Sequence, residues 1–86
     1  MNDAMLERVQ RVVARVAGAA RTPSNAGPDT PLAAGGFWLD SVDLVEVGVA
    51  CEEEFAVTFE GESDLTAEAM RTVRTLADLI LSKGPR

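Results

Sequence analysis

The sequence predicts an all-α protein, a bundle of four helices with a long loop between the first two and a short third helix. Three observations support this fold class. Apolar residues recur at helical spacing in three long segments, and six Pro and Gly residues exclude a continuous helix between positions 22 and 39. The run of strand-forming residues at 56–59 is too short and isolated to begin a sheet. With 86 residues, 47% of them apolar, the chain is expected to form one domain with a modest core.

The first helix is expected at about residues 3–20. One of its faces repeats Val, Leu and Met, and the other carries Glu and Arg. Asn2 or Asp3 is the expected N-cap, and Gly18 lies near the expected end. The loop that follows, at about 21–39, is long enough to need packing or a function of its own. Its expected anchors on the core are Leu32, Phe37, Trp38 and Leu39.

The second helix is expected at about residues 41–55. Asp40 is a suitable N-cap because its carboxylate can accept free N–H groups of the first turn. Asp43 adds a negative charge where the helix dipole favours one. One face should meet the core through side chains at helical spacing, namely Leu44, Val47, Cys51 and Phe55.

That assignment leaves a second apolar stripe on the same helix. The stripe comprises Val42, Val45 and Val49, and acidic residues flank it. Two interpretations are open: the helix has a wide buried face, or the stripe meets a partner.

The rest of the chain predicts two more helices. A short third helix is expected at about 64–70, capped by Ser63 or Asp64. The last is expected at about 73–83, with Thr72 as its N-cap, and the Gly-Pro pair that follows should end it.

The net charge of −6 is unevenly distributed. Residues 22–70 contain eleven acids and no Lys or Arg, whereas both ends of the chain are net positive. Such an acidic segment repels phosphate backbones, which argues against nucleic-acid binding. The same charge would steer the protein toward basic partner surfaces. The alternative is that acidity only keeps a small domain soluble.

Composition favours a cytoplasmic protein that neither crosses a membrane nor catalyses a reaction by itself. No apolar run is long enough for a membrane span, no signal-peptide pattern begins the chain, and the single Cys51 cannot form an internal disulfide. The chain has no His and no Tyr, so Ser41 lacks the usual base, and no Cys/His set suits a metal. Asp40 and Asp43 should act as caps rather than as an acid–base pair. Cys51 should behave as a small apolar core residue.

Several segments together resemble acyl carrier proteins. Leu39-Asp40-Ser41-Val42, the later Glu52-Glu53-Glu54-Phe55, and Thr72 to Ile80 carry the similarity, which covers nearly the whole chain. It implies that Ser41, preceded by Asp40, bears a 4′-phosphopantetheine arm derived from coenzyme A. By this resemblance, the thiol of the arm holds acyl, aryl or aminoacyl cargo as a thioester and presents it to biosynthetic enzymes.

The resemblance also suggests what the second stripe meets. The implied partner-recognition face consists of Val42, Asp43, Val45, Glu46, Val49 and Glu53. Its expected partners are a phosphopantetheinyl transferase, an acyl- or aminoacyl-loading enzyme, and ketosynthase, transferase or condensation-type enzymes with basic docking surfaces. The carrier alone is expected to be a monomer, and Met1 with the C-terminal tail favours a free-standing protein over an excised domain.

Trp38 departs from the family pattern, in which the position three before the modified Ser is usually Gly. The local turn is therefore expected to be built through Gly35 and Gly36. Trp38 is expected to cover the edge of the core or, alternatively, to lie beside the arm and touch its cargo. The departure favours a specialised polyketide, peptide or lipid pathway over bulk fatty-acid synthesis. A second function stays open: an unmodified acidic helical module that docks on a basic partner.

Overall fold

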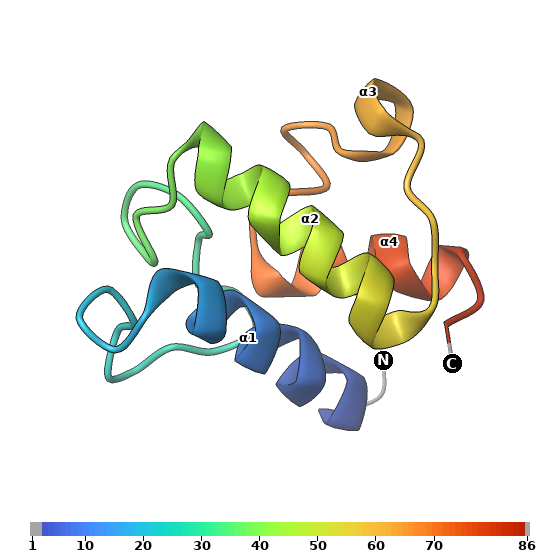
Figure 1. Ribbon diagram of the computed structural model, residues 1–86. Helices are drawn as coiled ribbons and strands as arrows, with labels where there is room; N and C mark the ends of the chain where they lie inside the picture. The colour runs from blue at the N-terminus through green and yellow to red at the C-terminus, as the bar shows by residue number, and fades with distance from the viewer. Residues whose placement is uncertain (1–2, 86) are drawn as a thin grey trace.

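A computed structural model of the chain describes residues 3–85, apart from the side chain of Glu62. Its helices are α1 (Asp3–Ala17), α2 (Ser41–Phe55), the single turn α3 (Gly61–Asp64) and α4 (Val73–Ser82) (Figure 1). No strand forms within this part of the chain, so the predicted all-α class is confirmed. The four-helix bundle is not confirmed, because three helices of ten or more residues make the fold and α3 adds only four residues.

Helix α1 packs against both α2 and α4 (Figure 1). Apolar side chains from all three helices and the long loop form one core. The largest fully buried side chains are Val9, Val13, Leu32, Phe37, Val47, Cys51, Phe55, Val73, Leu76 and Ile80. Among residues 3–85, no helix combines the length and the hydrophobicity that a membrane crossing requires.

Helix α1 ends at Ala17, three residues before the expected end. Gly18 has a φ of +81°, and this left-handed conformation stops the helix. The Arg21 side chain then donates to the carbonyl oxygens of Ala17 and Val16, which satisfies two acceptors that the helix end leaves free. The proposed cap Asn2 lies outside the described residues.

The short third helix was expected at 64–70, and this prediction is wrong. The helical turn lies earlier, at Gly61–Asp64, and the residues that follow form turns. Asp64 does not cap a following helix; its carboxylate accepts from the Glu60 N–H at 2.6 Å and pairs with Lys83 Nζ at 2.7 Å. Because that carboxylate is already committed, it leaves no cap for a helix at 65.

Helix α4 begins at its predicted cap. The Thr72 hydroxyl accepts from the Thr75 N–H, and the Thr75 hydroxyl accepts from the Thr72 N–H, so each side chain satisfies the other's backbone. The helix ends at Ser82, with Lys83 as its C-cap and Gly84 in the left-handed region.

The long loop is fastened to the residues around the start of α4. The Leu32 N–H donates to the Arg71 carbonyl at 3.0 Å, and the Arg74 N–H donates to the Pro28 carbonyl at 2.7 Å. Arg74 also pairs with Asp29 at 2.8 Å. The predicted anchors Leu32, Phe37 and Leu39 are buried, which confirms three of the four.

Candidate functional site

The start of α2 is held by a reciprocal cap. Asp40 has an extended backbone, and its carboxylate accepts from the Asp43 N–H at 2.8 Å; the Asp43 carboxylate accepts from the Asp40 N–H at 3.0 Å. The predicted N-cap is confirmed. Each carboxylate satisfies a donor that the helix end would otherwise leave free, so the first turn of α2 is well ordered.

Ser41 is the first residue of α2, and its side chain is exposed. Within the described chain, the N–H groups of Ser41 and Val42 donate to no protein acceptor. Two free amides at the positive end of a 15-residue helix favour a negative group on the neighbouring hydroxyl. Ser41 therefore combines access from solvent with an electrostatic environment suited to a phosphate ester.

Arg21 and Asp43 form an ion pair beneath this first turn, with 2.7 Å between Arg21 Nη1 and Asp43 Oδ2. The hydrogen bond from Arg21 holds the pKa of the Asp43 carboxyl below its usual value, and the Asp40 N–H adds to the effect. Only 16% of the Asp43 side chain is exposed. Asp43 is therefore engaged within the fold.

The second apolar stripe of α2 faces solvent. Val42, Val45 and Val49 are 66%, 62% and 49% exposed, whereas Val47, Cys51 and Phe55 are fully buried. The interpretation of a wide buried face is wrong. Glu46 and Glu53 are also exposed, so this surface offers aliphatic side chains together with carboxylates.

An open groove of about 220 Å³ lies beside Ser41, between α2 and the turns that precede α4. Its lining is mostly apolar and comprises Ser41, Leu44, Val45, Leu65, Thr66, Ala67 and Met70. Leu44, expected in the core, is only half-buried and lines this groove instead. Residues 65–67 line the groove because they lie in turns. The predicted helix at 64–70 would have placed their side chains at helical spacing, so the sequence did not indicate this wall of the groove.

Gly48 sets how closely the groove wall approaches α2. A Cβ at Gly48 would lie 3.2 Å from Leu65 Cδ1, tighter than ordinary packing allows. The absence of a side chain there lets Leu65 settle against the helix.

Trp38 was expected to cover the edge of the core, but its side chain is 64% exposed and does not do so. Its φ of +57° lies in the left-handed region, which is costly for a residue with a Cβ. Gly35 and Gly36 shape the turn as predicted: Gly35 has a φ of +89°, and a Cβ at Gly36 would overlap the carbonyl oxygen of Pro31. Trp38 nevertheless takes a left-handed conformation itself.

The described residues contain no cluster of His, Cys, Asp and Glu that could hold a metal ion. Burial raises the pKa of the Cys51 thiol to about 12, so this thiol stays protonated and unreactive at neutral pH. Asp40 and Asp43, which flank Ser41 in the sequence, act as caps, and Asp43 is also an ion-pair partner of Arg21.

A family model described as a phosphopantetheine attachment site matches residues 7–80. Neither the comparison with curated proteins nor the comparison with solved structures gives a match.

Proposed function

Because the chain belongs to the phosphopantetheine attachment site family, we propose that it is a carrier protein whose arm is attached to Ser41. The group that this family carries is 4′-phosphopantetheine, bound covalently. The observation that best supports Ser41 is its exposed hydroxyl on the first turn of α2, next to two amides without a protein acceptor. A phosphodiester needs such an accessible oxygen and such donors, so the residues fit the group.

When bound, the arm supplies a thiol that holds cargo as a thioester. The chain's own residues do the positioning. The Ser41 oxygen would anchor the arm, the Ser41 and Val42 amides would be available as donors to its phosphate, and the Asp40–Asp43 cap keeps this turn from fraying. Asp40 keeps its carboxylate directed at the Asp43 N–H, which partly neutralises its charge beside the phosphate.

We further propose that the exposed stripe of α2 is the partner-recognition face. Val42, Val45 and Val49 would supply its apolar contact, and Glu46 and Glu53 would meet basic residues of the partner. Asp43 supports the face from beneath, since it is paired with Arg21. The proposed partners are a phosphopantetheinyl transferase, a loading enzyme, and ketosynthase, transferase or condensation-type enzymes.

The groove beside Ser41 is the proposed binding place for the end of the arm or for a short apolar cargo. Its walls are aliphatic, and Ser41 itself forms part of its rim. A volume of about 220 Å³ is below that of typical drug-sized pockets, which start at roughly 300 Å³, so a small acyl group suits it better than a long chain. The departure from Gly at Trp38 supports a specialised pathway rather than bulk lipid synthesis.

The proposal is tested by intact mass after incubation with coenzyme A and a permissive phosphopantetheinyl transferase. We expect a gain of one phosphopantetheine unit in the wild type and in Ser24→Ala, which removes an exposed serine near the beginning of the loop. Ser41→Ala should gain nothing while its helical spectrum is unchanged. A well-folded wild type that gains no mass would instead favour the unmodified acidic docking module.

A further inference from the structure

Trp38 is an exposed indole on a backbone that the fold holds rigidly. The backbone N–H of Trp38 donates to the Ala33 carbonyl at 2.9 Å. Its neighbours Phe37 and Leu39 are buried, and their N–H groups donate to Pro31 and Leu32 at 3.0 Å. These bonds on both sides fix the left-handed conformation of Trp38 and direct its side chain away from the core. A strained residue that gains no burial in return marks a position where the side chain serves something outside the fold.

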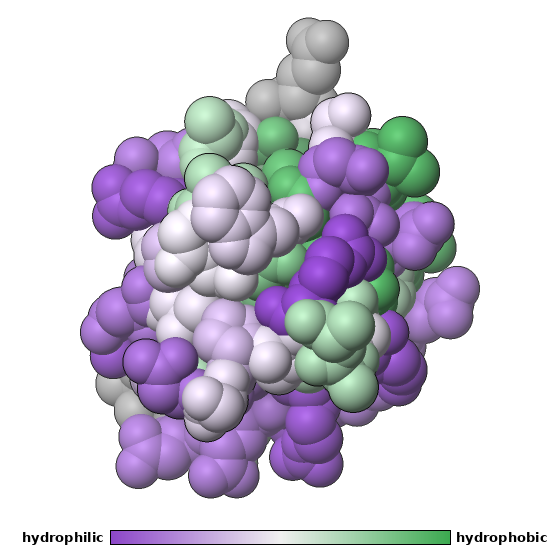
Figure 2. All heavy atoms as spheres, turned by 90° about the vertical axis from the view of Figure 1, so that its left-hand side faces the viewer, coloured by the Kyte–Doolittle hydropathy of each residue, from purple (hydrophilic) through white to green (hydrophobic). Residues whose placement is uncertain are grey.

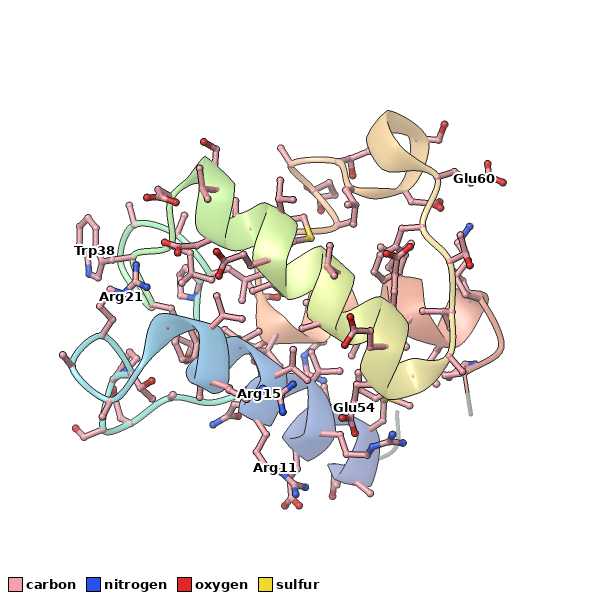
Figure 3. The ribbon with its side chains drawn as sticks, viewed as in Figure 1. Arg11, Arg15, Arg21, Trp38, Glu54 and Glu60 are labelled. Carbon is pink, nitrogen blue, oxygen red and sulfur yellow. The ribbon has the colours of Figure 1, made fainter. Side chains whose placement is uncertain are left out.

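The indole lies at the end of the molecule that carries Ser41. Figure 3 shows Trp38 and Arg21 projecting at this end, from the loop before α2 and the turn after α1. Figure 2 looks onto the same end and shows near-neutral residues over much of its middle, with a strongly hydrophilic group beside them and hydrophilic residues along the lower rim. Trp38 lies outside helix α2, three residues before Ser41, in the loop that leads into its first turn.

Trp38 does not face the groove that would take the arm or its cargo. The groove lies against residues 65–70, and Trp38 is not among the residues that line it. The loop that carries Trp38 runs on the other side of the start of α2 (Figure 1). The partner of the indole is therefore a surface that approaches from outside.

An interface centred on Ser41 is wide enough to include Trp38. Three residues of extended chain span at most about 11 Å. A standard interface of about 800 Å² on each partner corresponds to a disc of about 16 Å radius, which includes Trp38 when it is centred on Ser41. Buried Trp residues near the centre of an interface are frequent hot spots, and a rigid backbone lowers the entropic cost of burying them.

We propose that Trp38 is a specificity residue that inserts into an apolar pocket of the phosphopantetheinyl transferase acting on Ser41. This inference rests on the proposed carrier function. The pocket would have a cationic rim, because the carboxylates of Asp40 and Glu46 are exposed nearby, whereas Arg21 is already paired with Asp43. A transferase shaped for Gly at this position would meet the indole as an obstacle, so the same residue excludes unsuited partners.

Trp38 is the single Trp of the chain, which makes it its own probe. We would replace it biosynthetically with 5-fluorotryptophan, record its one ¹⁹F resonance in the apo protein, and titrate with an unlabelled phosphopantetheinyl transferase that modifies the wild-type protein. The expected result is a shift or broadening that saturates with the enzyme. A resonance that is unmoved by the enzyme overturns the proposal. So does one that moves on conversion to the holo form alone, or with the concentration of the apo protein alone, because the arm or a second copy would then cover the indole.

Kinetics of modification provide the second readout. Trp38→Ala should lower kcat/KM by about tenfold, mostly through KM, as hot-spot truncations do. Trp38→Phe should recover part of the loss, and Leu81→Ala, which truncates an exposed apolar residue on α4, should behave as the wild type. Trp38→Gly separates the indole from the strained backbone: equal losses in the Ala and Gly variants assign the effect to the indole. Wild-type rates in Trp38→Ala overturn the inference, whereas a wild type that is never modified overturns the carrier function itself.

Discussion

Asp43 joins two parts of the chain through one carboxylate. Its Oδ2 accepts from the Asp40 N–H and from Arg21, which follows the end of α1, and its own N–H donates to Asp40. The first turn of α2 is thus attached to α1 at the place where the arm is proposed. Sequence spacing predicts the pairing of Asp40 with Asp43, because both belong to one helix start. It does not predict Arg21, which lies 22 residues away.

The ion pair gives stability a pH dependence with a defined sign. The pKa of Asp43 is lowered from 3.8 in the folded protein, so its charged form contributes stability above that value. The contribution is lost as the pH falls through the lower, folded pKa. We expect Asp43→Asn to be less stable than the wild type at neutral pH, with the difference shrinking at pH below 3.8.

Urea unfolding of the wild type and of Asp43→Asn, from neutral pH to below pH 3.8, checks the prediction. Glu53→Gln is the matched control, since Glu53 is an exposed acid of the same helix with no ion pair among the described residues. A gap between wild type and Asp43→Asn that stays constant at acid pH would contradict the assignment.

The conformation of the loop before α2 is the part of the fold that is hardest to predict from the sequence. Its buried anchors are readable from hydrophobicity, but Trp38 is the largest hydrophobic residue in it and is the one that stays exposed. Hydrophobicity alone cannot tell these cases apart, because the direction of a side chain in a loop follows from backbone angles. Here those angles depend on the close approach of Gly36 to Pro31.

Gly36 is therefore expected to be intolerant of a side chain. A Cβ there would overlap the carbonyl oxygen of Pro31, a backbone atom that also accepts from the Phe37 N–H. Gly36→Ala should lower the free energy of unfolding by about 1–3 kcal/mol or more, measured by urea denaturation. Gly27→Ala, with open space around the new Cβ and no positive φ, should leave stability unchanged or raise it by up to about 1 kcal/mol. Equal effects of the two substitutions would show that the loop repacks freely.

Helix α2 carries two faces with different tasks. Its buried face holds the fold through Val47, Cys51 and Phe55, and its exposed face is free for contact. We expect Val45→Arg to leave the helical spectrum and the unfolding midpoint unchanged. It should impair modification or loading by partner enzymes, because a charge replaces apolar contact and opposes a basic surface. Normal turnover with every partner enzyme would remove Val45 from the proposed face.

At the scale of the whole molecule, charge is distributed to suit its proposed encounters. The net charge is −6, and the acids concentrate in the central part of the chain that contains α2. Around α2, Arg8 and Arg21 are paired with Glu54 and Asp43, whereas Arg11 and Arg15 of α1 have no ion pair among residues 3–85. Glu46 and Glu53 are exposed on α2 and, in a chain of net charge −6, give their face a negative long-range field.

This distribution predicts a salt-dependent rate of modification. Between about 0.1 M and about 1 M salt the screening length falls from about 10 to about 3 Å, so kcat/KM with a phosphopantetheinyl transferase should fall markedly while the helical spectrum does not change. A Glu46→Gln/Glu53→Gln variant should begin with a lower rate and lose less of it. Rates that are independent of salt would contradict steering by this face.

Much of the fold can be predicted from local sequence signals. The features that the sequence does not predict depend on contacts between residues far apart in the chain. Asp40 and Thr72 mark the starts of α2 and α4 through caps that a sequence displays directly. The sequence favours a helix at 64–70 because Asp64 is a good cap in isolation, whereas in the folded chain its carboxylate pairs with Lys83. Helical spacing separates the valine stripe from the core face of α2, but it leaves open whether the stripe is buried, and only the structure shows that it is exposed. The groove depends on turns whose shape the spacing does not reveal.

The burial of Cys51 has a consequence for how faithfully a thioester would be kept. A cysteine thiolate near an arm could capture the cargo by exchange and discharge the carrier. Cys51 is the only cysteine, it is fully buried, and its pKa of about 12 leaves almost no thiolate at neutral pH. The terminal sulfur of the arm would then have no rival within the molecule. A maleimide dye added to the native holo protein should label that sulfur alone, without any cysteine having to be removed first.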